Sequence, residues 1–393
     1  MTGSICEHVT DVDSAKIFAA IELSKASWLV ALHLPSHEKI SVFQVPGGDV
    51  DRLLAIIERA RETAMARGVS PSVEIHTCYE AGYDGFWLHR LLHAHGIHNQ
   101  VVDSASIQVS RRHRNVKTDH TDAESLLRVL MAWHRGETKA CSIVRVPTPE
   151  EEDLKRLHRS RETLLHERVR HVNRIRGLLC LQGIRHIDPG RDGWTAALVG
   201  LQTRDGRPFP VRLMAEIRRE GKLLAVAQTL LREVGAELEA LVRVKSSGRR
   251  QHAVRSTVRH PVALQLARLR GIGPTFAAVL STEVFYRTFS NRRAVASFVG
   301  LTPTPYSSGT SSREQGISKA GNAWARHNAV ELAWLWLRHQ PASGLTRWFH
   351  ARVGDAKGRV RRIAIVALAR KLIVALWRFV DTGLVPDGAI VKG

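Results

Sequence analysis

The stretch Phe18-Ala-Ala-Ile-Glu-Leu-Ser-Lys25 decides the fold of the first part of the chain. Its apolar residues predict a short strand over 18–23, with the carboxylate of Glu22 close to the end of that strand. The runs 28–34 and 39–45 predict two further strands, and the Pro-Gly-Gly sequence at 46–48 ends the third. Three successive strands of this kind predict the start of a sheet.

Helices and strands alternate after these three strands. The predicted order is helix 53–66, strand 72–79, helix 85–95, strand 98–102 and helix 119–133. Such an order predicts an α/β layer fold with a mixed sheet, in which functional sites form beyond strand ends. Glu22 and Glu80 both fall at predicted strand ends.

Four carboxylates are the candidate catalytic and metal-binding residues: Glu22, Glu80, Asp119 and Asp122. The two aspartates lie three residues apart at a predicted helix start, in Lys117-Thr-Asp-His-Thr-Asp-Ala123, so they share one helical face. Carboxylate oxygens are the ligands that hard divalent cations prefer, and pairs of such cations assist phosphodiester cleavage. We therefore expect Mg²⁺ at this site, with Mn²⁺ as the alternative.

The charge of the chain favours a nucleic-acid partner. Among 393 residues, 58 Lys and Arg outnumber 37 Asp and Glu, which gives a net charge of +21. A basic run directly precedes Asp119, and its candidate phosphate-binding residues are Arg111, Arg112, Arg114 and Lys117. A solvated loop is the alternative interpretation of that run.

Composition also narrows the class of protein. None of the four cysteines forms a Cys-x-x-Cys pair, so neither a disulfide framework nor a zinc ribbon is indicated. We expect a reduced, cytoplasmic setting, because no signal peptide is visible and the longest apolar stretch, 363–380, is interrupted by basic residues. His89 and His93 are spaced for zinc, but no acidic or Cys partner has suitable spacing.

Three domains are predicted: 1–145, 146–250 and 251–393. The middle one contains apolar residues at helical spacing over 150–183 and 211–244, separated by a loop over 186–210. This pattern predicts an antiparallel coiled-coil arm. A two-helix arm cannot bury its apolar stripe alone, so we expect a homo-oligomer, a dimer or a tetramer.

The last domain is predicted to be mainly helical and carries two signals. Gly271-Ile-Gly273 resembles a helix-hairpin-helix turn that contacts phosphate, although a tight helix connection is an equal alternative. The segment 300–322 is predicted to be a Ser/Thr/Pro/Gly loop, with Arg313 and Lys319 as candidate nucleic-acid contacts. A serine there has the chemistry of a nucleophile, but residue chemistry alone favours a simple loop.

The motifs together resemble a known family. The order Ile-Glu-x-Ser-Lys, Tyr-Glu-Ala-x-x-Tyr, Lys-Thr-Asp-x-x-Asp-Ala, Gly-Leu-Thr-Pro, Ser-Ser-Gly and Gly-Ile-Ser-Lys-x-Gly-Asn is similar to that of insertion sequence 110 transposases, the Piv-invertase-like DEDD recombinases. The resemblance covers about residues 17 to 383. Each motif is weak alone, and their joint order is specific.

The resemblance implies a RuvC-like (RNase H-type) nuclease domain, a coiled-coil arm and a transposase domain with a catalytic serine. It implies that the four acids bind Mg²⁺ and that the serine forms a covalent phosphoserine with DNA. Carried over, that serine is Ser308, with Ser307 second and Ser318 third. Related members use a structured guide RNA and act as multimers, so the implied partners are DNA, guide RNA and further copies of the chain in a bacterial cytoplasm.

One residue departs from the family pattern, and alternatives remain open. The first acid of the family is usually Asp, whereas Glu22 is one methylene longer. Asp84 is interpreted as a helix N-cap and Asp103 as a turn residue. The competing functions are a serine-assisted transposase, a structure-selective nuclease that uses water, and a non-enzymatic nucleic-acid-binding protein.

Overall fold

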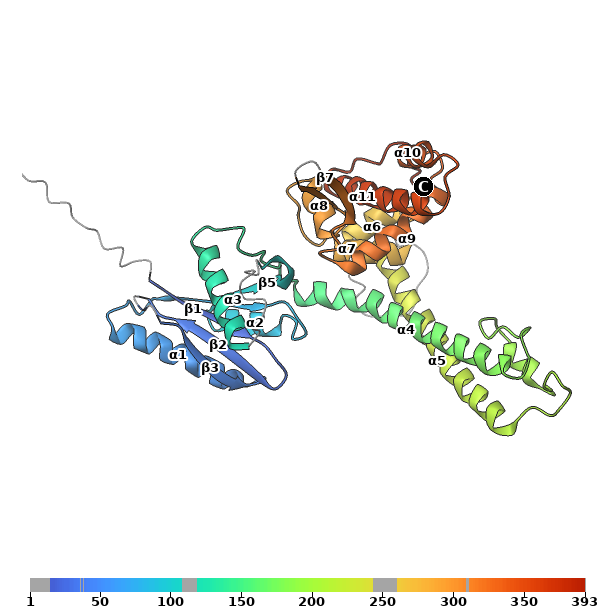
Figure 1. Cartoon of the computed structure of the whole chain (residues 1–393), viewed down its shortest axis with the longest axis horizontal. Helices are drawn as coiled ribbons and strands as arrows, with labels where there is room; N and C mark the ends of the chain where they lie inside the picture. The colour runs from blue at the N-terminus through green and yellow to red at the C-terminus, as the bar shows by residue number, and fades with distance from the viewer. Residues whose placement is uncertain are drawn as a thin grey trace, which may run out of the picture. The chain divides into compact units, whose positions relative to one another are not determined.

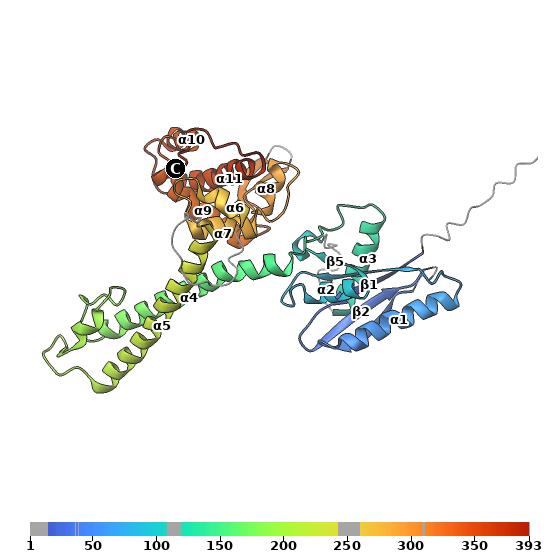
Figure 2. The same cartoon turned by 180° about the vertical axis from the view of Figure 1, so that it is seen from behind.

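The computed structural model describes residues 15–35, 37, 39–107, 119–242, 260–308 and 311–392, apart from the side chains at 119, 120, 306–308 and 311–314. The chain forms two compact units, residues 1–146 and 147–393, each with its own core (Figure 1, and Figure 2 from behind). No helix of the described residues has the length and hydropathy needed to cross a bilayer.

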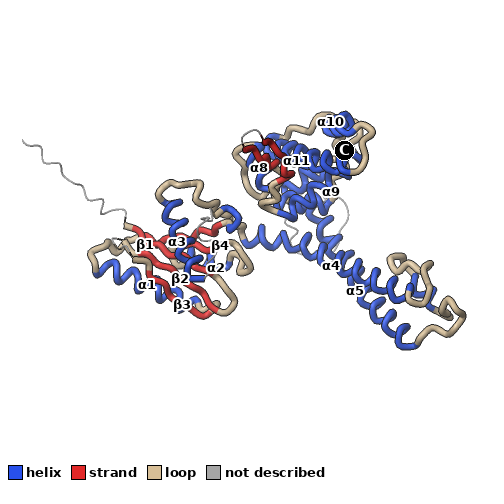
Figure 3. Tube along the Cα trace, in the orientation of Figure 1, coloured by secondary structure: helices blue, strands red, loops and turns tan. Residues whose placement is uncertain are grey.

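A mixed five-stranded sheet forms the centre of the N-terminal unit (Figure 3). Its strands are β1 (Lys16–Glu22), β2 (Ser27–His33), β3 (Ser41–Pro46), β4 (Glu74–Glu80) and β5 (His98–Val102). Their order across the sheet is β3-β2-β1-β4-β5, with β1, β4 and β5 parallel and β2 antiparallel to both of its neighbours. The predicted mixed α/β sheet is confirmed.

Helices cover both faces of this sheet. On one face, α1 (Val50–Ala66) and α2 (Trp87–Ala94) pack on Ile17, Ile21 and other apolar side chains. On the other face, α3 (Asp119–His134) packs on Ala20, Cys78 and their neighbours. Successive side chains of a strand point to opposite faces of the sheet. Alternate residues of one strand therefore pack under α1 and α2 or under α3.

Two long helices begin the C-terminal unit. They are α4 (Pro149–Cys180) and α5 (Val211–Val242), which pack along each other. Thr148 starts α4 with a capping box, in which its hydroxyl accepts from the Glu151 amide and Glu151 accepts from the Thr148 amide. The connecting segment contains a 3-10 helix at Trp194–Leu198 and contributes Ile184, Ile187 and Phe209 to a small core at this end of the helices.

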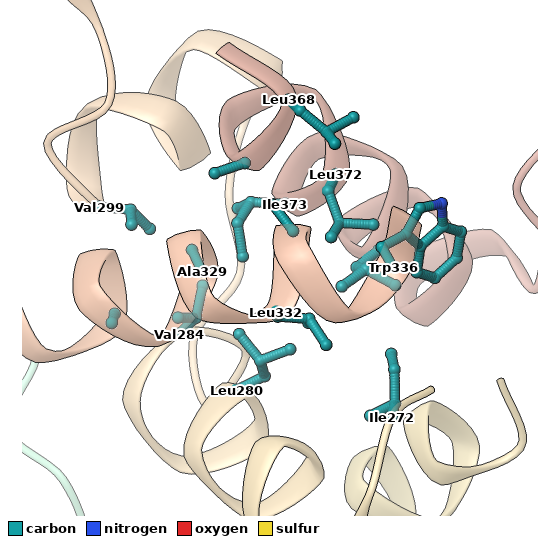
Figure 4. Packing of buried hydrophobic residues seen from close by; sticks show 14 of the residues in the cluster. Ile272, Leu280, Val284, Val299, Ala329, Leu332, Trp336, Leu368, Leu372 and Ile373 are labelled. Carbon is teal, nitrogen blue, oxygen red and sulfur yellow. The ribbon is translucent and has the colours of Figure 1, made fainter. Parts of the chain in front are cut away.

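The rest of the unit is mainly helical. Its helices are α6 (Pro261–Ala267), α7 (Pro274–Glu283), α8 (Arg292–Phe298), α9 (Ala323–His339), α10 (Gly344–Val353) and α11 (Arg359–Thr382). They enclose a core in which Trp336 of α9 packs near Leu372 and Ile373 of α11 (Figure 4). Trp336 is fully buried in this core.

A β-hairpin replaces part of the predicted loop at 300–322. Strands β6 (Pro303–Ser308) and β7 (Ser311–Ile317) pair antiparallel, with a register shift between Pro303 and Pro305. The expectation of an irregular loop was wrong there. Proline is tolerated in such a two-stranded ribbon because each strand has an outer edge that needs no amide donor.

Candidate active site

Glu22 and Glu80 end two neighbouring parallel strands of the sheet. Ile21 of β1 is paired in register with Tyr79 of β4, so Glu22 and Glu80 occupy the next position of each strand. Two positions earlier, Ala20 and Cys78 pair and contribute to the core beneath α3. By alternation, both glutamates belong to the sheet face that α3 covers.

Helix α3 brings Asp122 to the same face. Ala123 and Leu126 of this helix are buried against the sheet, and the Cys78 thiol lies 3.9 Å from the Leu126 carbonyl oxygen. Asp122 is half-buried and lies one helical turn before Leu126. Asp119 is the first residue of α3, one turn before Ala123, and its side chain lies outside the described residues.

A cavity of about 260 Å³ lies at the strand ends. Its lining includes Glu22, Glu80 and also Asp84, together with Lys25 and Tyr83. The Lys25 ammonium lies 4.8 Å from the centre of the exposed Tyr83 ring. Two loops, one after β1 and one after β4, therefore meet over the glutamates.

The interpretation of Asp84 as a helix N-cap was wrong. Helix α2 begins at Trp87, its N-cap position is Phe86, and no side chain caps it. Asp84 belongs instead to the cavity wall, two residues from the Gly82 backbone that also lines it. The Asp103 prediction is confirmed, because its carboxylate accepts a hydrogen bond from the Ala105 amide at 3.1 Å in a short 3-10 helix.

The chemistry of this donor set suits a hard divalent cation, since every titratable group proposed as a ligand is a carboxylate. Within the part of the chain that the structure describes, no three His, Cys, Asp or Glu side chains converge closely enough to hold a metal ion. The described members of the set, Glu22, Glu80 and Asp122, share a sheet face, and the Asp119 carboxylate falls outside that description.

The histidines considered for zinc have other partners. His89 Nδ1 lies 3.0 Å from the Asn99 side-chain amide, and His93 Nε2 lies 3.3 Å from the Asn99 carbonyl oxygen. Burial lowers the pKa of His89 to about 4. These contacts tie α2 to β5 and give both histidines a structural role.

The candidate nucleophiles lie on the β6–β7 hairpin. Ser308 is the last residue of β6 and pairs with Ser311, while Ser307 pairs with Ser312. Their side chains, like that of Arg313, lie outside the described residues. Ser318 differs, because its hydroxyl oxygen accepts a hydrogen bond from Thr302 at 3.3 Å and its amide donates to the Thr302 carbonyl at 2.8 Å. The Ser318 hydroxyl thus has a hydrogen-bond partner within the same segment.

The segment after the hairpin, around Lys319, is held in place by hydrogen bonds and close backbone contacts. Lys319 has φ +57°, and it is the only residue other than glycine with positive φ among those the structure describes. Its carbonyl oxygen accepts from the Arg326 guanidinium at 2.9 Å, and its amide donates to the Gly300 carbonyl. Gly300 and Gly321 leave no space for a Cβ, which would lie 1.9 Å and 2.2 Å from backbone oxygens. Such braced strain is typical of functional segments.

A buried carboxylate connects this segment to α4. Glu283, at the end of α7, is 2 % exposed. Its Oε1 accepts from Arg159 Nε and Nη2 at 3.0 Å and 2.8 Å, and its Oε2 accepts from Asn322 Nδ2 at 3.0 Å. Asn322 also caps α9 through the Ala325 amide. Glu283 therefore joins three helices of the C-terminal unit, and sequence analysis did not single it out.

The Gly271-Ile-Gly273 turn lies between α6 and α7. Gly271 has φ +89°, and a Cβ there would lie 2.8 Å from His339 Cβ, which explains the glycine. The turn lines a cavity of about 520 Å³ with Arg161 of α4 and Trp324 of α9. Both interpretations, a phosphate contact and a tight connection, remain compatible with this geometry. The basic residues Arg111, Arg112, Arg114 and Lys117 lie outside the described residues.

Comparison with known proteins identifies the family. Residues 263–347 match the model described as transposase IS116/IS110/IS902 family, and residues 23–183 match the transposase model DEDD_Tnp_IS110. A Sinorhizobium fredii protein described as putative transposase y4rJ is 45% identical over 385 residues, which cover 97% of this chain and 96% of the relative. The chain belongs to the IS116/IS110/IS902 family of transposases.

Two more distant relatives agree with this assignment. The chain is 28% identical to putative transposase y4qE of Sinorhizobium fredii, over 82% of this chain and 72% of the relative. It is 26% identical to the transposase for insertion sequence element IS1328 of Yersinia enterocolitica, over 68% of this chain and 73% of the relative. The transposase is thus an enzyme that cuts and transfers DNA strands, and the sequence-based family assignment is confirmed. The DEDD match begins directly after Glu22, so it does not bear on the first acid.

Proposed function

We propose that the transposase exchanges DNA strands through Mg²⁺-dependent, serine-assisted chemistry directed by a guide RNA. The observation that carries the metal-dependent part is the position of Glu22 and Glu80 directly after the paired residues Ile21 and Tyr79 of neighbouring parallel strands, on the face that α3 covers. Three carboxylates from separate elements on one sheet face, two of them lining a cavity, favour a site that handles phosphate through a cation.

Each acid has a stated role in this proposal. Glu22, Glu80, Asp119 and Asp122 hold the cations, with Mn²⁺ as a substitute for Mg²⁺. Cations bound there supply Lewis-acid polarisation of the scissile phosphate. Lys25, which lines the same cavity, adds a positive charge that attracts the DNA backbone.

The nucleophile in the proposal is Ser308. Its hydroxyl oxygen forms a bond to phosphorus while the bond to the DNA 3′-oxygen breaks, and the serine proton passes to that leaving oxygen. The strand end is retained as a phosphoserine, and a 3′-OH from the partner duplex reverses the step. One phosphoester replaces another at each stage, so no nucleotide hydrolysis is required. Ser307 is the second candidate and Ser318 the third; the Ser318 hydroxyl accepts a hydrogen bond from Thr302.

Phosphate contacts in the proposal come from both units. Arg111, Arg112, Arg114 and Lys117 precede α3, whereas Arg313, Lys319 and the turn at Gly271 and Gly273 belong to the C-terminal unit. The proposed phosphate contact of Lys319 is supported by its exposed side chain and by the hydrogen bond that fixes its backbone. The proposed phosphate contact of the turn is supported by its position beside Arg161, which lines the same cavity.

The two long helices are proposed to act as a coiled-coil arm that joins copies of the chain. Three apolar side chains on α5, Leu223, Val226 and Leu230, are 52%, 57% and 40% exposed. Their spacing places them on one face of the helix. Burial of this stripe against a second copy would remove it from water.

An adduct assay tests this function. The transposase is mixed with Mg²⁺, labelled DNA that spans the ends of its element, and co-purifying RNA, and the products are separated on a denaturing gel. We expect labelled DNA at the mobility of the protein, lost in Ser308→Ala and retained in Ser318→Ala. An adduct that survives in Ser308→Ala but not in Ser307→Ala moves the nucleophile by one residue.

The same gel separates the competing functions. Nicked DNA without an adduct in the wild type would favour a nuclease that uses water. Salt-sensitive binding without any strand change would favour a non-enzymatic nucleic-acid-binding protein. Treatment with ribonuclease before the reaction tests the guide RNA separately, since loss of specific cleavage is expected while the fold remains intact.

A further inference from the structure

A second cavity of the N-terminal unit, of about 670 Å³, lies between the edge strand β3 and helix α1. It is on the sheet face opposite the acids. Phe43 of β3 pairs with Val30, which belongs to the core beneath α1, whereas Ala20 and Cys78 lead to the acids on the α3 face. We call this cavity the edge groove. A molecule bound in it is separate from a strand held at Glu22 and Glu80.

The edge groove carries a strong positive charge. Arg52, Arg59 and Arg67 line it together with His37, and no Asp or Glu is among its described lining residues. The three arginines are exposed, and none of them forms an ion pair with another residue that the structure describes. On the same helix Arg61 is different, because it pairs with Glu58 at 3.5 Å. Three unneutralised guanidinium groups along one groove favour a polyanionic occupant.

The arginines are spread along the length of α1, from its first turn to its C-cap. Arg52 and Arg59 are seven residues apart, which returns them to nearly the same helix face, and Arg67 follows eight residues later at the C-cap, turned by about 80°. At 1.5 Å per residue they span about 22 Å. A row of charges of this length matches a chain with regularly repeated negative charges better than a single anion.

An aromatic side chain lies beside this row. Phe43 is 42% exposed although its strand neighbour Val45 is fully buried on the same face. An exposed ring next to arginines is a platform on which a nucleic-acid base stacks, and stacking tolerates any base. The base must be unpaired, because a base within a duplex has both faces covered by its neighbours.

We propose that the edge groove binds an unpaired nucleic-acid strand, with Arg52, Arg59 and Arg67 on successive stretches of its phosphate backbone and Phe43 stacked on a base. The charge of the groove disfavours an added protein strand at the edge of β3, the other occupant that an edge strand can accept. The proposal needs neither the metal ligands nor Ser308, so it can fail or hold independently of the strand-exchange chemistry.

Fluorescence anisotropy on the full-length protein tests this proposal. The probes are labelled oligouridine and oligodeoxythymidine of about 20 nucleotides and a blunt DNA duplex, each titrated without divalent metal over a series of KCl concentrations. The variants are the double Arg52→Gln, Arg59→Gln and the single Phe43→Ala. Arg61→Gln is the matched control on the same helix. Circular dichroism checks that each variant is folded.

The double variant is expected to reduce the slope of log affinity against log salt by about 1.4, since each contact with a single strand contributes about 0.7. Phe43→Ala is expected to weaken binding of an unpaired strand at least about fivefold with no change of slope, and to leave duplex binding unchanged. Arg61→Gln should match the wild type. A larger loss for oligouridine would identify RNA as the occupant, and a larger loss for oligodeoxythymidine would identify DNA.

Two results would overturn the proposal. The first is an unchanged slope and affinity for both unpaired probes in the double variant. The second is an equal loss of duplex and single-strand binding in Phe43→Ala, which would leave a basic surface without base stacking. Unchanged nucleic-acid binding accompanied by a change in sedimentation would assign the groove to a protein partner instead.

Discussion

The carboxylate of Asp122 gives the most direct test at the scale of single residues. Asp122→Asn keeps the size of the side chain and removes its charge, so we expect DNA cleavage to fall at least ~100-fold while DNA binding persists. The control is Glu124→Gln on the same helix, because Glu124 pairs with Arg128 at 3.2 Å. Cleavage rates on labelled DNA measure both. Equal losses in the two variants would indicate damage to α3, not the loss of a ligand.

Gly321 tests whether the braced segment after the hairpin is as tightly built as its contacts indicate. A Cβ at Gly321 would lie 2.2 Å from the Phe298 carbonyl oxygen, and φ is +80°. Gly316 has φ +93°, but a Cβ there would meet nothing within 4 Å. We expect Gly316→Ala to cost about 1–2 kcal/mol from backbone strain alone and Gly321→Ala about 2–5 kcal/mol. Urea unfolding compares them, and equal costs would contradict the close packing.

Single residues also show which parts of the site could be predicted from the sequence. The strand runs that end at Glu22 and Glu80 were visible because apolar β-formers precede each acid. Asp84 was misassigned because Gly85 was taken as the start of a helix that begins at Trp87. Glu283 gave no signal, since its partners Arg159 and Asn322 are 124 and 39 residues away. Long-range polar contacts of this kind leave no periodic trace in a sequence.

At the scale of elements, we expect the stability of the junction of α4 and α7 to depend on pH. His158 of α4 is buried, and its Nε2 lies 3.1 Å from the Thr282 hydroxyl and 3.4 Å from Glu283. Burial lowers the pKa of His158 to about 4, although Glu283 opposes that effect. The pKa in the folded state is below the unfolded value of about 6.5, so the stabilisation is complete above pH 6.5 and lost as the pH falls toward 4.

We therefore expect the free energy of unfolding to decrease by up to about 3 kcal/mol through His158 between these two pH values. His158→Gln, which cannot take up the proton, should flatten the profile by that amount. His166→Gln is the control, because His166 is 77% exposed on the same helix. Urea midpoints at several pH values measure the difference from wild type. Parallel profiles for wild type and His158→Gln would contradict the assignment.

Elements also differed in how well their sequences identified them. The helix predicted over 119–133 was found within one residue of its observed bounds, Asp119–His134, because its apolar residues recur every three or four positions. The β6–β7 hairpin was missed because its strands contain Pro, Ser and Thr without alternating apolar residues. Its pairing comes from backbone hydrogen bonds and from the braced segment that follows, neither of which a hydrophobic pattern encodes.

At the scale of the whole molecule, the exposed stripe on α5 predicts self-association. Leu223→Lys with Leu230→Lys should shift the transposase toward monomer, because two charges would then have to be buried in the contact. Ala225→Lys adds a charge on the opposite side of the same helix and should leave assembly unchanged. Sedimentation velocity measures each variant. Identical behaviour of the double variant and the wild type would exclude this stripe as the contact.

The structure of the two long helices allows the length of the pair to be changed. Each spans 32 residues, and the segment that joins them has a small core of its own, with Ile184, Ile187 and Phe209. Seven residues make almost two full turns, so a matched deletion of seven from the middle of each helix preserves which side chains face each other. The pair would become about 10 Å shorter while its two ends stayed intact. The length of this helix pair can therefore be changed in steps of seven residues without altering which side chains face each other.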